Sequence, residues 1–347
     1  MSSKIVGIDI GSASVRAVEV RHPGKKPVIT KVAEVALPEG SVRRGEVLEV
    51  ATVATAIRRL WANGRFGTRD VVLGIGGPRV LSRDVAVPRA PLDQIREALP
   101  FHVQDLLPVP AHEALLDFYP ISEGTGENGP VVHGLLVAAV KEAVTANVSA
   151  VMRAGLRPVA VDLIPFALVR GLLPAAGNRG LVAVVSIGAN TTNVVLVQDG
   201  VPQFVRIIPS GGDDITRALV ERLTIAPTQA ETLKRELGLS GVPSHPEYRP
   251  AAEIIFELAG EQLNAIRNTL AYYVNSKPGA AIDRIVLSGG GSQLTGLPRA
   301  LSDLSGIPVL PADPLGGAPL PRDRSRASRE EQDALTTAWS LALGSAA

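Results

Sequence analysis

A strand–turn–strand segment that occurs twice places the strongest constraint on how this 347-residue chain can fold. Residues 6–20 read VGIDIGSASVRAVEV, and residues 183–197 read AVVSIGANTTNVVLV. Aligning the two segments places Gly11 over Gly188, so the copies lie 177 residues apart. Each copy has an apolar strand, a glycine turn with small polar residues, and a second alternating strand. Two similar units in one chain predict duplicated lobes that face a cleft.

The two glycine turns are suited to bind an anion. Glycine permits a tight turn whose backbone N–H groups point outward, and small hydroxyl or amide side chains let a phosphate approach them. Asp9 ends the first strand, where its carboxylate is placed to hold a water molecule bound to Mg²⁺. Each turn alone also fits an ordinary hairpin, but the matching register of the pair favours anion binding.

A third glycine segment lies near the end of the chain, in IVLSGGGSQLTGLP at 285–298. Three consecutive glycines after an apolar strand leave no side chain between the backbone and a flat or charged ligand. The alternative is a flexible link between a strand and a helix. The chain has neither GxxxxGK[ST] nor a strand–GxGxxG–helix unit, which excludes a P-loop and a dinucleotide-binding Rossmann unit.

Composition narrows the function classes. The net charge of +1 gives no broad electrostatic reason to bind nucleic acid or anionic lipid. The absence of cysteine excludes disulfides, thiolate metal sites and cysteine nucleophiles, and it fits a reducing cytosol. The longest apolar runs, at 135–140 and 181–187, are far shorter than the roughly 20 residues of a membrane helix. We therefore expect a soluble, cytoplasmic protein without direct membrane insertion.

The apolar pattern predicts a first lobe that is interrupted by an insertion. Residues 1–68 begin with three strands and a helix, and form the first part of this lobe. Residues 69–157 predict a compact α+β block, which we interpret as an inserted subdomain with a loop at 122–129. Residues 158–176 return to the first lobe and lead to the second.

The second lobe is predicted over 177–347, because the repeated unit begins there. It includes a helical subdomain at about 213–275 and ends in a packed helix at 330–344. A length of 347 residues also favours two lobes over a single core.

The motifs GIDIGSAS, SIGANTT and GGGS, in this order, resemble those of the actin, DnaK and sugar-kinase superfamily. Within it, LLPVPAHEALLDF, SGGDDITRAL and AETLKRELG make the chain similar to the PilM family of type IV pilus assembly proteins, relatives of the cell-division protein FtsA. The resemblance implies an α/β, actin-like (ribonuclease H-like) two-lobe fold with an inserted small α+β subdomain. It also implies that ATP and Mg²⁺ bind between the lobes.

The resemblance assigns roles to residues at matching positions. Asp9 would face Mg²⁺, and Glu231 and Lys234 would reach the ribose or adenine. The residues that would surround the phosphates and the adenosine, besides these three, are Gly11, Ser12, Ala13, Ser14, Gly188, Asn190, Thr191, Thr192, Gly211, Gly212, Gly289, Gly290, Gly291 and Ser292.

Two positions depart from an ATP hydrolase of this superfamily. Ser186 stands where the second phosphate loop usually begins with Asp, and Ile164 stands where the chaperone ATPases place a Glu near the attacking water. An apolar side chain cannot accept a proton or orient water. Asp162 lies two residues away and is the remaining candidate carboxylate. We expect ATP to be bound and hydrolysed slowly or not at all.

The family resemblance also implies partners. The main one is the N-terminal cytoplasmic peptide of a PilN-type inner-membrane protein, docked in extended form in a groove between the first lobe and the inserted subdomain. This partner would recruit the chain to the inner face of the membrane, with the pilus assembly ATPase and self-association as further contacts.

Two alternatives share the same superfamily. A small-molecule kinase needs a carboxylate base beside the acceptor hydroxyl, and no such Asp stands out in this sequence. An FtsA-like filament-forming division protein carries a basic amphipathic C-terminal helix, whereas this sequence has no Lys or Arg after Arg329.

Overall fold

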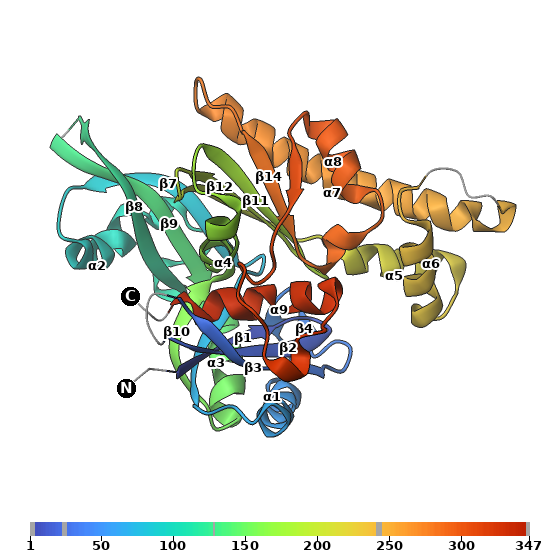
Figure 1. Cartoon of the computed structure of the whole chain (residues 1–347). Coiled ribbons are helices and arrows are strands. Elements are labelled where there is room, and N and C mark those ends of the chain that lie inside the picture. Colours follow the sequence, from blue (N-terminus) through green and yellow to red (C-terminus); the bar gives the residue numbers. More distant parts are fainter. Residues whose placement is uncertain (1–3, 23–25, 128, 241–244, 345–347) are drawn as a thin grey trace.

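The computed structural model describes residues 4–22, 26–127, 129–240 and 245–344 of the chain (Figure 1). In these ranges, no helix combines the length and the apolar character that crossing a membrane requires. Short single-turn helices lie at Gln104–Leu106, Ala111–Glu113, Pro246–Tyr248, Gly290–Gln293 and Arg322–Arg324.

The first lobe is built on a five-stranded sheet of order β10-β6-β1-β2-β3. Strands β1, β2 and β3 form an antiparallel meander, and β6 and β10 add to β1 in parallel. Helices α1 and α3 cover one face, and their apolar side chains share a core with β1 and β2. These elements span Lys4–Ile10 (β1), Ser14–Arg21 (β2), Val28–Ala36 (β3), Asp70–Ile75 (β6), Arg157–Leu163 (β10), Val50–Gly64 (α1) and Lys141–Arg153 (α3), with a small hairpin of Val42–Arg43 (β4) and Glu46–Val47 (β5).

The second lobe repeats this sheet, with the order β13-β12-β11-β14-β15. The meander is again antiparallel and the last two strands are again parallel. Four helices complete the lobe, and side chains of all four enter its main core. The elements span Leu181–Ile187 (β11), Thr192–Gln198 (β12), Val201–Ile208 (β13), Arg284–Ser288 (β14), Val309–Pro311 (β15), Gly212–Leu223 (α5), Pro227–Leu237 (α6), Arg249–Ser276 (α7) and Leu297–Ser305 (α8).

The two lobes share strand register as well as strand order. In the first hairpin Lys4 pairs with Arg21 and Ile10 with Val15, and in the second Leu181 pairs with Gln198 and Ile187 with Thr192. Every pair in one hairpin therefore matches a pair 177 residues later in the other. The prediction of a duplicated strand–turn–strand unit is confirmed.

Two helices tie the lobes together. Helix α4 (Ile164–Ala176) packs with β11, β12 and β14 of the second lobe. Helix α9 (Arg329–Ala342) packs with β1, β2 and β6 of the first lobe, where Figure 1 shows it lying across these strands. The prediction that 177–347 lies wholly in the second lobe is therefore wrong for α9, because its apolar stripe finds its matching surface on the first sheet.

A separate three-stranded sheet, of order β7-β9-β8, accounts for the insertion. Its strands are Val80–Pro88 (β7), Ala114–Gly126 (β8) and Gly129–Val140 (β9), with helix α2 at Leu92–His102 packed against them. The interpretation of 69–157 as one separate block needs correction at both ends. Strand β6 and helix α3 belong to the first lobe, because the buried side chains of β6 need cover on both faces of the sheet. We propose 78–140 as the inserted subdomain.

The loop expected at 122–129 is also corrected. Strand β8 continues through it to Gly126, paired with β9 from Gly129 onward. A ladder of backbone hydrogen bonds holds this hairpin, so its polar and glycine-rich sequence does not prevent strand formation.

Candidate functional site

The two glycine turns have the same internal hydrogen bond. The amide of Gly11 donates to the carbonyl of Ser14 at 3.0 Å, and the amide of Gly188 donates to the carbonyl of Thr191 at 2.8 Å. In the part of the chain that the structure describes, the N–H groups of residues 12, 13, 189 and 190 donate to no protein group. Successive free N–H groups in a tight turn form a concave site for an anion.

The second turn is fixed to the start of helix α5. The amide of Gly212 donates to the carbonyl of Gly188 at 2.9 Å, and the amide of Asp213 donates to that of Ala189 at 2.8 Å. A Cβ atom on Gly211 would lie 2.4 Å from the carbonyl oxygen of Ala189, so only glycine allows this approach. The structure thus brings Gly211 and Gly212 to the turn at Gly188. Closeness to this turn explains Gly211 without a ligand, whereas a Cβ atom on Gly212 would lie 3.1 Å from Gly291 Cα.

The three glycines after β14 lie beside the end of β11 and the turn at Gly188. Gly289 has a left-handed backbone (φ 87°), and a Cβ atom there would lie 2.4 Å from the carbonyl oxygen of Ile187. A Cβ atom on Gly291 would lie 2.5 Å from Ile187 Cγ2. Ser292 closes the turn, since its hydroxyl donates to the Gly289 carbonyl at 2.6 Å. The segment is an ordered turn packed on β11, which argues against the flexible-link alternative.

Gly290 differs from its two neighbours. No atom lies within 4 Å of the position that a Cβ atom on Gly290 would occupy, so protein packing does not require glycine there. An open position beside two tightly packed glycines is what a ligand that approaches the backbone would need.

Glu231 and Lys234 of α6 join this cluster through Thr216, a residue that was not predicted from the sequence. Lys234 Nζ donates to the Gly212 carbonyl at 3.1 Å and to Thr216 Oγ1 at 2.8 Å, and it lies 2.6 Å from Glu231 Oε2. The Thr216 hydroxyl in turn donates to Glu231 at 2.8 Å. Thr216 follows Gly212 by one helical turn, which places it on the same side of α5 and was the signal available in the sequence.

The environment of Glu231 keeps its carboxylate ionised. Burial raises the pKa of Glu231, but hydrogen bonds from Lys234, Arg235 and Thr216 outweigh it and lower that pKa to about 2. Arg235 also lies 2.7 Å from Glu330 at the start of α9. This ion pair connects the cluster on the second lobe to the helix that covers the first.

On the first lobe, Asp9 has a cationic neighbour, Arg16, that was also not predicted from the sequence. Arg16 NH1 lies 3.8 Å from Asp9 Oδ2, and its Nε donates to Glu34 at 2.9 Å. Burial raises the pKa of the Asp9 carboxyl, and the Arg16 guanidinium opposes that rise. Arg16 is the direct cross-strand partner of Asp9, so the hairpin register alone could have revealed it. Beside them, Ser14 Oγ is buried with no partner among the described residues.

The matching positions in the second lobe carry no charge. Ser186 pairs with Asn193 across the hairpin and with Ser288 on the neighbouring strand, so these three side chains share one face of the sheet. All three are buried, and among the described residues Asn193 Oδ1 and Ser288 Oγ have no hydrogen-bond partner. The Asp9–Arg16 ion pair of the first lobe is thus replaced by a neutral row.

Ile164 and Asp162, the other two positions that bear on hydrolysis, also make contacts within the protein. Ile164 packs against the end of β6, where a Cβ atom on Gly74 would lie 2.7 Å from Ile164 Cγ1. The Asp162 carboxylate accepts a hydrogen bond from Arg170, so it is committed to an ion pair. In the described ranges, no three His, Asp or Glu residues gather as a metal site would require.

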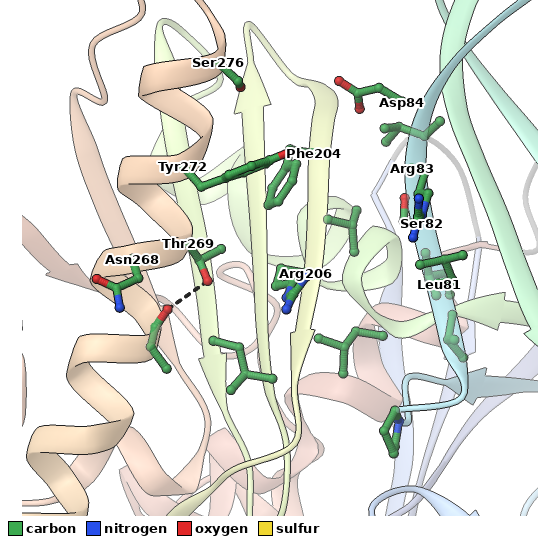
Figure 2. A pocket seen from close by; sticks show the side chains of 18 of the residues that line it. Leu81, Ser82, Arg83, Asp84, Phe204, Arg206, Asn268, Thr269, Tyr272 and Ser276 are labelled. Atoms are coloured by element: carbon green, nitrogen blue, oxygen red, sulfur yellow. Dashed lines mark hydrogen bonds between the residues drawn. The ribbon is translucent and has the colours of Figure 1, made fainter. Parts of the chain in front are cut away.

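The contacts therefore join the predicted residues into two groups, one on each lobe. A cavity of about 1060 Å³ among the described residues is lined by none of them. It lies between the inserted sheet and the second lobe (Figure 2).

Comparison with known proteins shows which family this chain belongs to. The family described as "Type IV pilus assembly protein PilM" matches residues 7–346. The chain belongs to the PilM family. A solved structure described as a PilM–PilN type IV pilus biogenesis complex is 28% identical, with 98% of this chain and 97% of that chain covered and a TM-score of 0.83.

More distant relatives agree on the fold. FtsA of Bacillus subtilis is 24% identical over 278 residues, which covers 73% of this chain but only 61% of that protein. FtsA of Neisseria meningitidis is 23% identical and covers 93% of this chain and 86% of that protein. MreB 5 of Spiroplasma citri, bound to AMPPNP, is 12% identical, with 89% and 91% of the two chains covered and a TM-score of 0.52. The PilM-family chain has an actin-like fold, as predicted.

Proposed function

We propose that this PilM-family chain binds ATP between its two lobes and acts as a cytoplasmic scaffold of type IV pilus assembly. The observation that carries the proposal is the pair of turns at Gly11 and Gly188, which share register, internal hydrogen bond and free N–H groups. Each turn belongs to a different lobe, so a triphosphate held by both would draw the lobes together.

The residues present fit a nucleotide. On the first lobe, the N–H groups of Ser12 and Ala13 and the buried hydroxyl of Ser14 face no protein acceptor or donor among the described residues. On the second lobe, the N–H groups of Ala189 and Asn190 would hold phosphate, and the open backbone at Gly290 would border the adenosine. When bound, ATP would supply the negative charge that these N–H groups stabilise.

Mg²⁺ would be held mainly by the phosphates and their waters. Asp9 is the carboxylate in the first turn, and it already faces Arg16 at 3.8 Å. It would hold a Mg²⁺-bound water rather than form a protein cage, since Mg²⁺ usually keeps several waters beside one or two carboxylates.

Hydrolysis is proposed to be weak, so that the nucleotide acts as a conformational switch. Ser186 is neutral, Ile164 is apolar, and Asp162 is paired with Arg170. None of the three offers an unpaired carboxylate to orient an attacking water. A ligand shifts an equilibrium between open and closed lobes through its different affinity for the two states.

The partner we propose is the N-terminal cytoplasmic peptide of a PilN-type inner-membrane protein. Support comes from the PilM–PilN complex, to which the chain is similar over 98% of its length. The peptide would lie in extended form between the first lobe and the inserted subdomain and recruit the chain to the membrane. A pilus assembly ATPase and further copies of the chain would be additional contacts.

Isothermal titration calorimetry of a synthetic PilN-type tail into the full chain, with and without Mg²⁺ and ATP, tests this proposal. We expect one-to-one binding whose affinity changes with nucleotide, whereas a scrambled tail does not bind. Binding that ignores nucleotide would contradict the switch, and absence of binding in both conditions would contradict the scaffold function.

A further inference from the structure

The large cavity is a groove between the inserted sheet and the second lobe (Figure 2). Strand β7 contributes the consecutive residues 80–84 to one wall, and β13 with the following Pro209 contributes 204–209. The other wall is helix α7, where Ala265, Asn268, Thr269, Tyr272 and Ser276 share one face. Runs of consecutive residues line the groove because both strands turn their edges, rather than their faces, toward it.

Both strands are edge strands. Strand β7 ends the sheet of order β7-β9-β8, and β13 ends the sheet of order β13-β12-β11-β14-β15. An edge strand carries backbone N–H and C=O groups that are not paired within its sheet, and these can pair with another strand.

The ladder of β7 shows which backbone groups face the groove. The Val140 amide donates to the Arg79 carbonyl at 3.1 Å, and the Arg89 amide donates to the Pro130 carbonyl at 3.0 Å. Hydrogen-bonded pairs alternate along an antiparallel ladder, so the odd-numbered residues of β7 bond to β9. The N–H and C=O groups of Ser82, Asp84 and Ala86 therefore point outward.

The same reasoning applies to β13. The Gly188 amide donates to Thr191, and the Asp199 amide donates to Gly180, which turns the odd-numbered residues of β12 toward β11. From Thr192 to Leu196, before the register shifts, the even-numbered residues of β12 then bond to the even-numbered residues of β13. The backbone groups of Val205 and Ile207 are left facing the groove.

A second cavity of about 290 Å³ continues the groove along β7. It shares Asp84 and Lys277 with the first cavity and adds Val85 and Ala86. The free edge that borders the two cavities thus spans residues 80–86, a stretch of about 23 Å at the usual rise per residue of a strand. This length suits an extended segment better than a small molecule.

The charges along the groove favour an acidic occupant. Lys277 lies 3.4 Å from Asp84 across the groove, in an exposed ion pair of little energetic weight. Arg83 and Arg206 are exposed and form no ion pair within the described ranges. Between the strand and the helix, Phe204 and Tyr272 lie with ring centroids 5.9 Å apart, and Tyr272 is 64% exposed (Figure 2). The groove therefore offers cations and an aromatic surface together.

We propose that this groove binds an extended acidic segment of a partner protein, which adds as a strand to the free edge of β7. Its backbone would pair with Ser82 and Asp84, its acidic side chains would meet Arg83, Arg206 and Lys277, and its apolar side chains would contact Tyr272. None of the residues that line the groove is among the predicted nucleotide-site residues.

Fluorescence anisotropy with the full chain tests this inference. The probe is a labelled heptapeptide of alternating glutamate and valine, compared with a lysine–valine heptapeptide and with a glutamate–valine peptide N-methylated at alternate residues. We expect the first probe to bind at least about tenfold more tightly than either comparison peptide, a difference of about 1.4 kcal/mol. Charge reversal at Arg83→Glu and Arg206→Glu together should weaken its binding at least about tenfold.

A matched variant and a backbone variant keep the test specific. Arg59→Glu with Arg249→Glu makes the same change in net charge at two exposed positions outside the groove, and it should bind as the unaltered chain does. Ser82→Pro removes an N–H that faces the groove while leaving the ladder to β9, so it should weaken binding with normal thermal unfolding.

Several outcomes would overturn the inference. One is no binding of the glutamate–valine probe up to about 1 mM. Another is equal loss of binding in both charge-reversal pairs. Displacement of the probe by a PilN-type tail would show that the groove is not a separate site. A dimer in sedimentation equilibrium that dissociates on reversal of Arg83 and Arg206 would assign the groove to a second copy of the chain.

Discussion

Gly7 of β1 lies against Ala338 of α9 so closely that a Cβ atom on Gly7 would stand 2.0 Å from the Ala338 carbonyl oxygen. The same atom would lie 2.6 Å from the amide nitrogen of Ala342. The helix backbone thus rests directly on the strand that leads to Asp9, two residues later. This contact couples the position of α9 to the first turn of the candidate site.

We expect Gly7→Ala to destabilise the chain by about 3 kcal/mol or more, because two backbones would have to separate to admit a methyl group. Urea unfolding measures the effect. The matched change is Gly260→Ala within α7, where nothing lies within 4 Å of the added methyl group. That variant should be more stable than the unaltered chain by about 0.5–1 kcal/mol. Equal effects of the two substitutions would contradict the packing of α9 on β1.

A second prediction concerns Gly290, whose substitution meets no protein atom within 4 Å. We expect Gly290→Val to leave thermal unfolding in the absence of nucleotide nearly unchanged but to weaken binding of a fluorescent ATP analogue at least about tenfold, or 1.4 kcal/mol. Gly260→Val serves as the control, since it adds the same side chain at a position that also meets no protein atom within 4 Å, on a helix that contributes none of the predicted site residues. Unaltered nucleotide affinity in Gly290→Val would remove this loop from the site.

The third prediction concerns hydrolysis. Because Ser186 and Ile164 lack a carboxylate and Asp162 is bound to Arg170, we expect steady-state ATP turnover by the purified chain to stay well below about 1 s⁻¹, the low end of ordinary enzymes. Phosphate release measured without partners provides the rate. Asp162→Asn should leave that rate unchanged. Turnover of several per second, lost in Asp162→Asn, would make Asp162 the missing base.

The fourth prediction follows from Glu231, whose pKa is lowered to about 2. A carboxyl with a lowered folded-state pKa stabilises the fold above its unfolded pKa, near 4.5, and loses that contribution as the pH falls toward 2. The stability difference between the unaltered chain and Glu231→Gln should therefore be constant above about pH 5 and shrink below it. Denaturant unfolding at a series of pH values measures this difference.

Thr216→Val checks the cause of that shift. It removes one of the three donors to Glu231, so the pKa of the carboxyl should rise toward its usual value. A ¹³C NMR titration of the Glu231 carboxyl reports this pKa directly. An unchanged titration in Thr216→Val would show that Lys234 and Arg235 alone hold the carboxylate.

The sequence by itself determined the repeated unit, because a hairpin's register is set by its own turn. Gly11 and Gly188 place each turn, and the pairs on either side follow residue by residue. The same hairpin register places Asp9 opposite Arg16 and, in the second lobe, Ser186 opposite Asn193. These contacts needed no knowledge of the rest of the chain.

Only the tertiary structure decided where distant segments meet. The apolar stripe of α9 fits either sheet by pattern, and the contact of Gly7 with Ala338 selects the first. Strand β6 belongs to the first lobe and not to the insertion, because it pairs with β1 in a hydrogen-bonded ladder between segments distant in the sequence. The facing edges of β7 and β13 come from segments more than 100 residues apart. Local residue patterns specify turns and faces, but which faces meet depends on the shape of the whole chain.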